Sequence, residues 1–151
     1  MLIRYIKKNE MDELLNLYTH LHSKDVPTPD KSLLISIWDE IMSNSLLHNF
    51  VIEYDNKIVS SCTLSIIPNL TRGGRSYGLI ENVVTHTDYR RRGFGISLLQ
   101  HALNIAWNQK CYKVMLLTGS KDQAIHQFYE KSGFKKGIKT GFIAKAPNFS
   151  Y

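Results

Sequence analysis

The sequence has 151 residues, a formal net charge of +6, and 43% hydrophobic against 21% charged residues. This length predicts one domain over residues 1–151 with a single core, and the composition excludes a disordered chain. No apolar run approaches the ~20 residues that span a bilayer, and the segment Met1 to Lys8 is charged too early for a signal peptide. We therefore expect a cytoplasmic protein without a membrane partner.

The basic residues form separate clusters: Arg72 and Arg75, Arg90 to Arg92, and Lys135 to Lys139. A nucleic-acid-binding tail would gather them in one run, and no stacking pattern of aromatic residues or helix-turn-helix pattern accompanies them. The charge therefore favours a phosphorylated small molecule over nucleic acid as the partner. Cys62 and Cys111 lack metal-like neighbours, which predicts two free thiols and no metal site.

The chain begins with a predicted strand and two predicted helices. Leu2 to Ile6 is a short apolar run, and Met11 to His22 carries apolar residues at helical spacing. Pro27 and Pro29 end that helix, because proline cannot continue a helix interior. Asp30 can cap the next helix, whose apolar face consists of Leu34, Ile37, Trp38 and Ile41.

The middle of the chain predicts three strands. Asn49 to Tyr54 and Lys57 to Ile67 are rich in β-branched and aromatic residues, and Asp55-Asn56 between them suits a hairpin turn. Pro68 to Gly74 is a predicted loop before a third strand, Tyr77 to Thr87.

The last part of the chain alternates helices and strands. Gly95 to Asn108 is a helix with one apolar stripe, and Gln123 to Lys131 is a helix that Gly133 ends. The strands predicted here are Lys113 to Thr118, Phe134 to Lys136 and Thr140 to Ala144. The whole order indicates an α/β sheet with helices on both faces.

A basic, glycine-containing turn joins the third strand to the long helix. A helix N-terminus offers unpaired N–H groups and partial positive charge to an anion. Gly93 and Gly95 carry no Cβ, so a pyrophosphate can approach the backbone, although a simple tight turn would also use glycine here. Position 98 is Leu98, which excludes the dinucleotide fingerprint, and the P-loop's Gly-Lys-Ser/Thr is missing.

Two motifs in order give the chain its family resemblance. Arg90, Gly93 and Gly95 match the signature Gln/Arg-x-x-Gly-x-Gly/Ala, and Tyr129 is followed by Gly133-Phe134. The chain resembles the GNAT superfamily of acyl-CoA N-acyltransferases over residues 50–144, and the run from Ile80 to Val84 is similar to that of glucosamine-phosphate N-acetyltransferases. The resemblance implies a mixed, mostly antiparallel sheet of about six to seven strands flanked by about four helices, with acetyl-CoA as cosubstrate and no metal.

The resemblance also implies which residues hold the cofactor. The pyrophosphate would bind the backbone amides of Arg91, Arg92, Gly93, Phe94 and Gly95. Val83 and Thr85 would pair their backbone with the pantetheine arm, like an added strand. The family usually has a bulge in the strand that contains Val83. That strand separates from the strand Lys113 to Thr118, and the gap between them forms a slot for the cofactor arm. Asp122 stands where the family often has a pantetheine-contacting Asn, so that contact stays open.

Three residues are candidates for proton transfer. The resemblance implies that Tyr129 protonates the leaving thiolate, whereas a lone helical tyrosine usually packs. Glu81 is the candidate base, directly or through water, although a strand glutamate can equally point to solvent. His86 is the rival base, because histidine titrates near neutrality. A backbone N–H of Val84 or a neighbour would polarise the thioester carbonyl.

The acceptor implied is a small primary amine, with amino sugars ranked first. Arg72 and Arg75 could bind an anionic group such as a sugar phosphate, or they could be a solvated loop. A polyamine would need an acidic cluster, which the sequence lacks, while a protein or peptide amine stays open. A non-catalytic acyl-CoA sensor would also carry the basic turn, and an exposed terminal strand could pair two copies into a homodimer.

Overall fold

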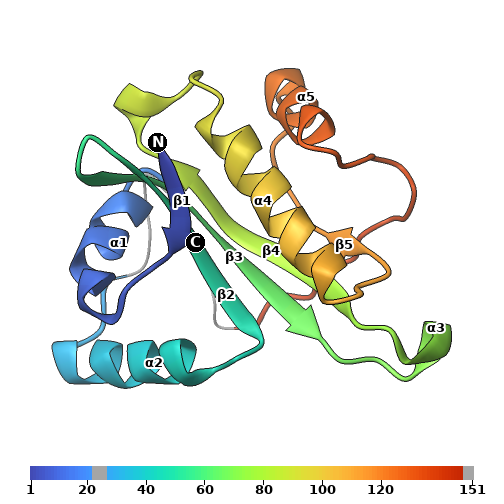
Figure 1. Cartoon of the computed structure of the whole chain (residues 1–151), viewed down its shortest axis with the longest axis horizontal. Coiled ribbons are helices and arrows are strands. Elements are labelled where there is room, and N and C mark those ends of the chain that lie inside the picture. Colours follow the sequence, from blue (N-terminus) through green and yellow to red (C-terminus); the bar gives the residue numbers. More distant parts are fainter. Residues whose placement is uncertain (22–26, 148–151) are drawn as a thin grey trace.

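The computed structural model describes residues 1–21 and 27–147, which form one five-stranded sheet between two layers of helices (Figure 1). The strands lie side by side in chain order: β1 Leu2–Tyr5, β2 Leu47–Tyr54, β3 Lys57–Ile67, β4 Tyr77–Thr85 and β5 Val114–Met115. The pairs β1–β2, β2–β3 and β3–β4 are antiparallel, and β4–β5 is parallel. The predicted class, a mixed and mostly antiparallel α/β sheet, is confirmed.

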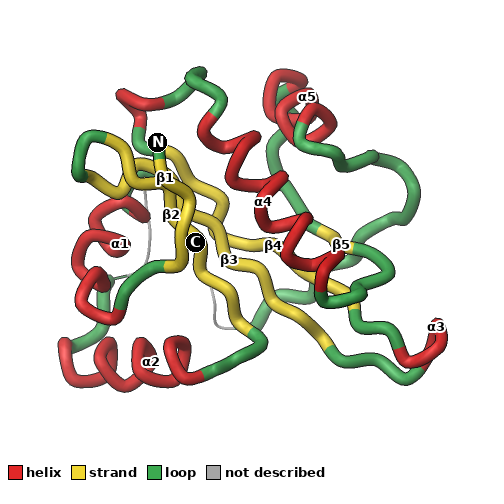
Figure 2. Tube along the Cα trace, in the orientation of Figure 1, coloured by secondary structure: helices red, strands yellow, loops and turns green. Residues whose placement is uncertain are grey.

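Among the described residues, two helices separate β1 from β2, none separates β2 from β3, and one follows each of β3, β4 and β5 (Figure 2). Their bounds are α1 Met11–Tyr18, α2 Lys31–Ser43, α3 Thr71–Gly74, α4 Phe94–Asn108 and α5 Gln123–Lys131, with short 3-10 turns at Lys8–Glu10 and Thr87–Tyr89. Asp30 caps α2 as predicted, since its side chain accepts hydrogen bonds from the N–H groups of Ser32 and Leu33. The helix predicted over Met11 to His22 stops at Tyr18, and His22 lies outside the described residues.

The sheet has fewer strands than predicted, because Phe134 to Lys136 and Thr140 to Ala144 form no strand in the described part of the chain. The strand predicted over Lys113 to Thr118 is only Val114–Met115. A strand needs hydrogen bonds to a neighbouring strand, and this C-terminal segment pairs with none of the five strands. Its Phe142 side chain is 92% exposed. An alternating pattern alone cannot report that missing partner.

The β2–β3 hairpin follows the prediction closely. Asp55 and Asn56 form its two-residue turn, with φ of 52° and 57°, and Tyr54 pairs with Lys57. Positive φ at both central residues matches the right-handed twist of the flanking strands, and Asp and Asn tolerate it. The hairpin therefore joins β2 and β3, which lie between β1 and β4 in the sheet.

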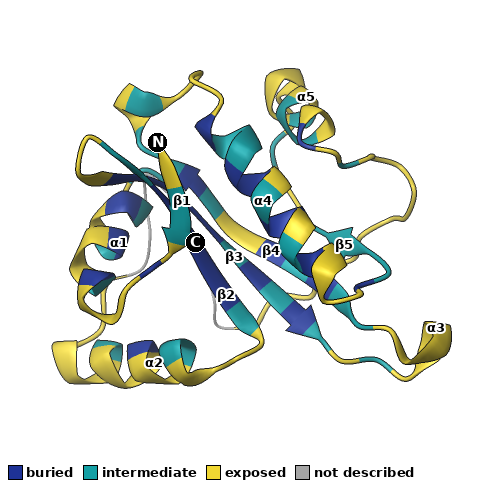
Figure 3. Ribbon diagram, viewed as in Figure 1, coloured by how far each residue is buried: buried dark blue, intermediate teal, exposed yellow. Residues whose placement is uncertain are grey.

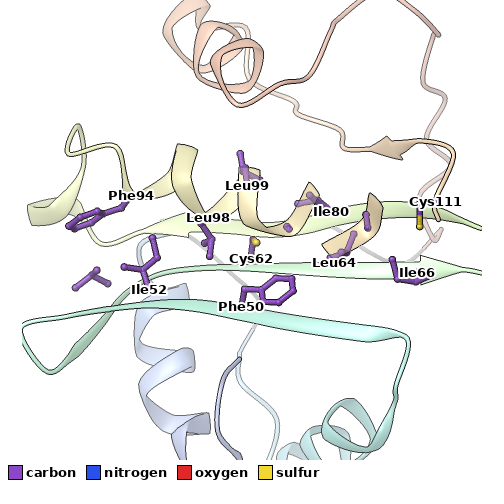
Figure 4. Packing of buried hydrophobic residues seen from close by; sticks show 13 residues of the cluster. Phe50, Ile52, Cys62, Leu64, Ile66, Ile80, Phe94, Leu98, Leu99 and Cys111 are labelled. Carbon is purple, nitrogen blue, oxygen red and sulfur yellow. The ribbon is translucent and has the colours of Figure 1, made fainter. Parts of the chain in front are cut away.

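Two cores lie on opposite faces of the sheet. The larger core joins α4 to β2, β3 and β4 through Phe50, Leu64, Ile80, Leu98 and Leu99, each at most 1% exposed (Figure 4). The smaller core packs α1 and α2 on the other face through Leu14, Leu17, Trp38, Val51 and Val84. Each fully buried leucine or phenylalanine stabilises the fold by about 1.5–3 kcal/mol. The colouring in Figure 3 shows the same division, with buried positions of α1, α2 and α4 facing the sheet.

The two cysteines belong to the buried interior. Cys62 and Cys111 are both free, as predicted, and both are buried. Burial raises the pKa of the Cys62 thiol to about 12, so this thiol stays protonated and unreactive at neutral pH.

A β-bulge interrupts β4 in its middle. Val84 pairs with Ser61 and Glu81 with Thr63, so Asn82 and Val83 of β4 face a single residue of β3. Asn82 takes a left-handed conformation, with φ of 54°. The bulge expected from the resemblance is therefore present, and it turns Asn82 and Val83 toward different cavities.

Gly95 is the point at which α5 packs on the start of α4. A Cβ at Gly95 would lie 2.9 Å from the Phe128 ring. We predict that Gly95→Ala lowers the free energy of unfolding by about 1–3 kcal/mol, because the ring must shift in a packed site. Urea unfolding measures the change. Gly119→Ala is the control, because its Cβ would meet nothing within 4 Å. Equal stability of both variants would contradict this packing role.

Candidate active site

A cavity of about 470 Å³ opens beside β4, within the range of small-molecule sites. Its walls come from β4, the turn before α4, the start of α4, α5 and the end of α1. Nine of the residues predicted from the sequence line it: Val83, Val84, Thr85, Arg90, Arg91, Gly93, Phe94, Gly95 and Tyr129. The sequence motifs therefore converge on one site, although Arg92, Glu81 and Asp122 are not among the lining residues.

The unpaired edge of β4 explains why the cavity exists. β4 pairs with β5 only at Gly78 with Val114 and at Leu79 with Met115. Beyond Leu79 the two strands part, as the resemblance implied, and α4 and α5 wall the gap instead of a strand. The backbone of β4 from Val83 to Thr85 therefore borders the cavity and is available to an extended ligand.

The turn before α4 has the backbone of an anion site. Arg91 and Gly93 both take left-handed conformations, with φ of 60° and 81°, in alternation with Arg92. Such an alternation turns successive N–H groups toward one concave side. Gly93 is the N-cap of α4 and provides no side-chain cap for the first N–H groups of the helix. The partial positive charge of the helix terminus adds to this arrangement.

Two of the turn's arginines hold the turn together. Arg90 donates to the carbonyl oxygens of Thr85, at 3.0 Å, and of His20, at 2.9 Å. Arg92 donates to the carbonyl of Asp88 at 3.1 Å, and its guanidinium lies 5.1 Å from the centre of the Tyr89 ring. Arg90 therefore joins the turn that follows α1 to the turn before α4, a positioning role that the motif alone did not reveal.

Histidines occupy the rim between α1 and this turn. His86 accepts the Asp88 N–H through Nδ1, at 3.2 Å, and its ring centre lies 4.0 Å from that of His20. His86 is absent from the lining of the cavity, whereas His20 lines it. Burial, with smaller effects of His86 and Arg90, lowers the pKa of His20. The geometry gives His86 a capping role, and neither His86 nor Glu81, the two candidate bases, is among the residues that line the cavity.

Tyr129 lines the cavity from α5, next to Phe128, whose ring centre is 4.9 Å away. Burial raises the pKa of the Tyr129 phenol, and the Glu81 carboxylate raises it further. The two predicted catalytic side chains therefore interact electrostatically. Glu81 itself is exposed, in β4 directly before the bulge.

Three predicted residues lie away from the cavity. Arg75 donates to the carbonyls of Lys110 and Cys111, at 3.2 and 3.3 Å, and Arg72 is exposed in α3, beyond the C-terminal end of α4 (Figure 1). Asp122 caps α5, because its carboxylate accepts the Ala124 N–H at 2.8 Å. The structure therefore does not bring Arg72 and Arg75 to either cavity of the described residues.

Sequence reasoning missed several lining residues. Ile125 and Phe128 share one face of α5 with Tyr129, so the helical spacing around the tyrosine could have identified them. Nothing in the local sequence marks His20 and Leu21, because the fold alone brings the end of α1 to the cavity.

A second cavity, of about 190 Å³, lies between α1, α2 and the other face of the sheet. Met11, Leu14, Leu15, Leu34, Ile37, Trp38, Ile41 and Leu47 form its apolar walls, and Tyr18, Asn49, Thr63 and Asn82 form its polar part. It includes the whole apolar face predicted for α2. Asn82 lines this cavity and its neighbour Val83 lines the larger one, so the β4 bulge lies between them.

The chain belongs to the acetyltransferase (GNAT) family, whose model matches residues 11–134. A glucosamine 6-phosphate N-acetyltransferase of Trypanosoma brucei brucei is 33% identical over 134 residues, 88% of each protein. A solved structure of a proposed acetyltransferase from Agrobacterium tumefaciens superposes with a TM-score of 0.90 at 39% identity, over 97% of this chain and all of that one. A solved structure of a Trypanosoma brucei acetyltransferase superposes with a TM-score of 0.79 at 29% identity, over 95% of this chain and 99% of that one. The family resemblance indicated by the two motifs is confirmed.

Two further observations concern metals and membranes. Within residues 1–21 and 27–147, no group of three or more His, Cys, Asp or Glu side chains is placed to hold a metal ion. None of the helices described is long and apolar enough to cross a membrane.

A substitution of Arg90 tests whether this residue positions the turn for acetyl-CoA binding. We predict that Arg90→Lys raises the Kd for acetyl-CoA about tenfold, because an ammonium cannot hold both carbonyls in the fixed fork of a guanidinium. Isothermal calorimetry measures the Kd. Arg72→Lys is the control and leaves the Kd unchanged, since α3 lies away from the cavity. An unaltered Kd in Arg90→Lys would refute its positioning role.

Proposed function

We propose that this acetyltransferase moves an acetyl group from acetyl-CoA to the primary amine of a small molecule, by direct attack in a ternary complex. The observation that carries the proposal is a single cavity lined by a basic turn at a helix N-terminus, an unpaired strand edge and the half-buried Tyr129. CoA has matching parts in the same order: a pyrophosphate, an extended pantetheine arm and a reactive thioester.

The backbone would bind the donor. The amides of the turn from Arg91 to Gly95 would hold the pyrophosphate, with the N-terminus of α4 adding its partial charge. Val83 and Thr85 line the cavity, so their backbone groups are the proposed partners of the pantetheine amides. A backbone N–H at the bulge, of Val84 or a neighbour, would then polarise the thioester carbonyl.

Glu81 and Tyr129 would carry the protons. As the amine attacks the carbonyl carbon, Glu81 accepts the proton of the amine, directly or through a water. The tetrahedral intermediate collapses, the C–S bond breaks, and the CoA thiolate takes the phenolic proton of Tyr129. The raised pKa of Tyr129 suits this role, because the phenol is fully protonated at neutral pH. Proton exchange with solvent then restores both groups.

The presence of both groups favours an enzyme over a sensor. A non-catalytic acyl-CoA sensor would need the anion-binding turn but neither Glu81 nor Tyr129, and in this chain the two interact electrostatically. The relatives' names make glucosamine 6-phosphate one candidate acceptor to be tested with other amines. A peptide amine is a further candidate within the same chemistry.

The proposed location is the cytoplasm, because free thiols such as Cys62 and Cys111 fit a reducing compartment.

A homodimer is proposed through the edge strand β1, on which Leu2 and Tyr5 are 54% and 51% exposed.

Removing the phenolic hydroxyl tests the acid. We predict that Tyr129→Phe lowers kcat by about 10²–10⁴ with little change in the Kd for acetyl-CoA. Because the acid must be protonated and burial raises the pKa of Tyr129, the alkaline fall of kcat in the wild type lies above the pH of an ordinary tyrosine, about 10. Free-thiol release measures kcat. Tyr77→Phe, in β4 but outside the cavity, is the control. An unchanged kcat in Tyr129→Phe rules out the acid role.

The carboxylate is tested through pH dependence. We predict that Glu81→Gln lowers kcat/KM and removes the limb on which the rate rises with pH, because an amide cannot accept the amine proton. The measurement is the pH–rate profile at saturating acetyl-CoA. Glu130→Gln, an exposed change on α5, serves as the control. A profile that keeps its shape would exclude Glu81 as the base.

A further inference from the structure

The second cavity, between α1, α2 and the sheet, has a mostly apolar lining. Most of its lining is aliphatic or aromatic, and no charged side chain lines it in the described part of the chain. Its volume, about 190 Å³, exceeds that of an apolar cavity of roughly 150 Å³ that binds benzene. The space opens to the surface, since Ile37 in its wall is 42% exposed, so a small ligand can enter it from solvent.

The polar groups of this cavity gather on the sheet side. Asn49, Thr63 and Asn82 belong to β2, β3 and β4, and the Thr63 hydroxyl donates to the Asn49 amide oxygen at 2.7 Å. Burial raises the pKa of Tyr18, and hydrogen bonding with Thr63 is the largest opposing effect. The walls from α1 and α2, by contrast, are apolar. The cavity is therefore amphipathic, with hydrogen-bonding groups at the sheet and hydrocarbon at the helices.

The polar side of the cavity lies next to the residues proposed for acetyl transfer. Asn82 lines it, and the flanking residues of β4 are Glu81, the candidate base, and Val83, which lines the donor cavity. A ligand with its nitrogen at the sheet would place that nitrogen beside the bulge. Its carbon skeleton would then fill the apolar space below α2.

We propose that this cavity receives the acceptor, and that the acceptor is a primary amine with an uncharged, apolar body, of the size of an arylalkyl or short alkyl amine. The inference rests on the proposed function and assigns the substrate class of the same enzyme. Asn49 and Asn82 hold the amine through their amide oxygens, and the helix walls select the hydrocarbon.

A sugar phosphate fits this cavity poorly. Its phosphate needs arginine or lysine partners, and burying it without them is costly. Arg72 and Arg75, the cations that the sequence suggested for that role, lie elsewhere, and Arg75 already donates to two carbonyls. Sugar hydroxyls against Leu34, Trp38 and Ile41 would also lose hydrogen bonds made in water. The acceptor class thus differs from that in the name of the trypanosomal relative.

Helix α2 offers a matched pair of variants. Ile37 and Ile35 are similarly exposed, at 42% and 44%, but only Ile37 lines the cavity. Ile37→Glu introduces a carboxylate at the apolar wall, and Ile35→Glu introduces the same charge on the outer face of the same helix. The pair therefore separates an effect on the cavity from an effect on helix or surface charge.

The experiment measures initial rates of thiol release from acetyl-CoA with phenethylamine, hexylamine, glucosamine and glucosamine 6-phosphate. For the wild type, we expect kcat/KM for the two apolar amines to exceed that for glucosamine 6-phosphate at least about tenfold. Ile37→Glu raises KM for the apolar amines about tenfold with the Kd for acetyl-CoA unchanged, and Ile35→Glu alters neither. If Ile37→Glu also loses acetyl-CoA binding, Ile37→Gln repeats the test without a charge.

The outcomes separate the inference from the function on which it rests. Preference for glucosamine 6-phosphate, or equal KM values in the wild type and Ile37→Glu, overturns the apolar acceptor and leaves the acetyltransferase standing. Acetyl-CoA binding without thiol release for any of the four amines overturns the apolar class, because phenethylamine and hexylamine represent it. Failure of a folded protein to bind acetyl-CoA removes the proposed function itself.

Discussion

β4 has a strand beside it for only part of its length, and this limited pairing shapes the whole site. After Gly78 and Leu79 pair with β5, the remaining outer edge of β4 is unpaired and the bulge at Asn82 redirects its side chains. Backbone N–H and C=O groups need partners, so an exposed edge next to an anion-binding turn is poised for an extended, phosphorylated ligand. Buried cores lie on both faces of the sheet beside this opening.

In the proposed mechanism, the two faces of the sheet hold the donor and the acceptor separately. On the α4–α5 face, the turn around Gly93 and the phenol of Tyr129 belong to one cavity, while the α1–α2 face carries the smaller apolar cavity. Arg90 couples the faces mechanically, because it bonds the turn to the end of α1 through the His20 carbonyl.

Local patterns in the sequence predicted the hairpin turn at Asp55-Asn56, the Asp30 cap and the helix α5, because each depends on a few neighbouring residues. The two motifs predicted most of the larger cavity for the same reason. The terminal strands failed, since pairing depends on a distant partner that an alternating pattern does not reveal. Only the packed fold shows that Arg72 and Arg75 lie away from the larger cavity and that His20 lines it.

The proposed mechanism depends above all on acetyl-CoA binding by the turn before α4 together with the free edge of β4. A comparison of the calorimetric Kd of acetyl-CoA with that of acetylpantetheine, which has the thioester arm but no nucleotide, tests this binding mode. We expect saturable one-site binding of acetyl-CoA, at least about tenfold tighter than that of acetylpantetheine, because only acetyl-CoA offers a pyrophosphate to the turn. Equal affinities, or no binding by the folded protein, would show that this binding mode is wrong.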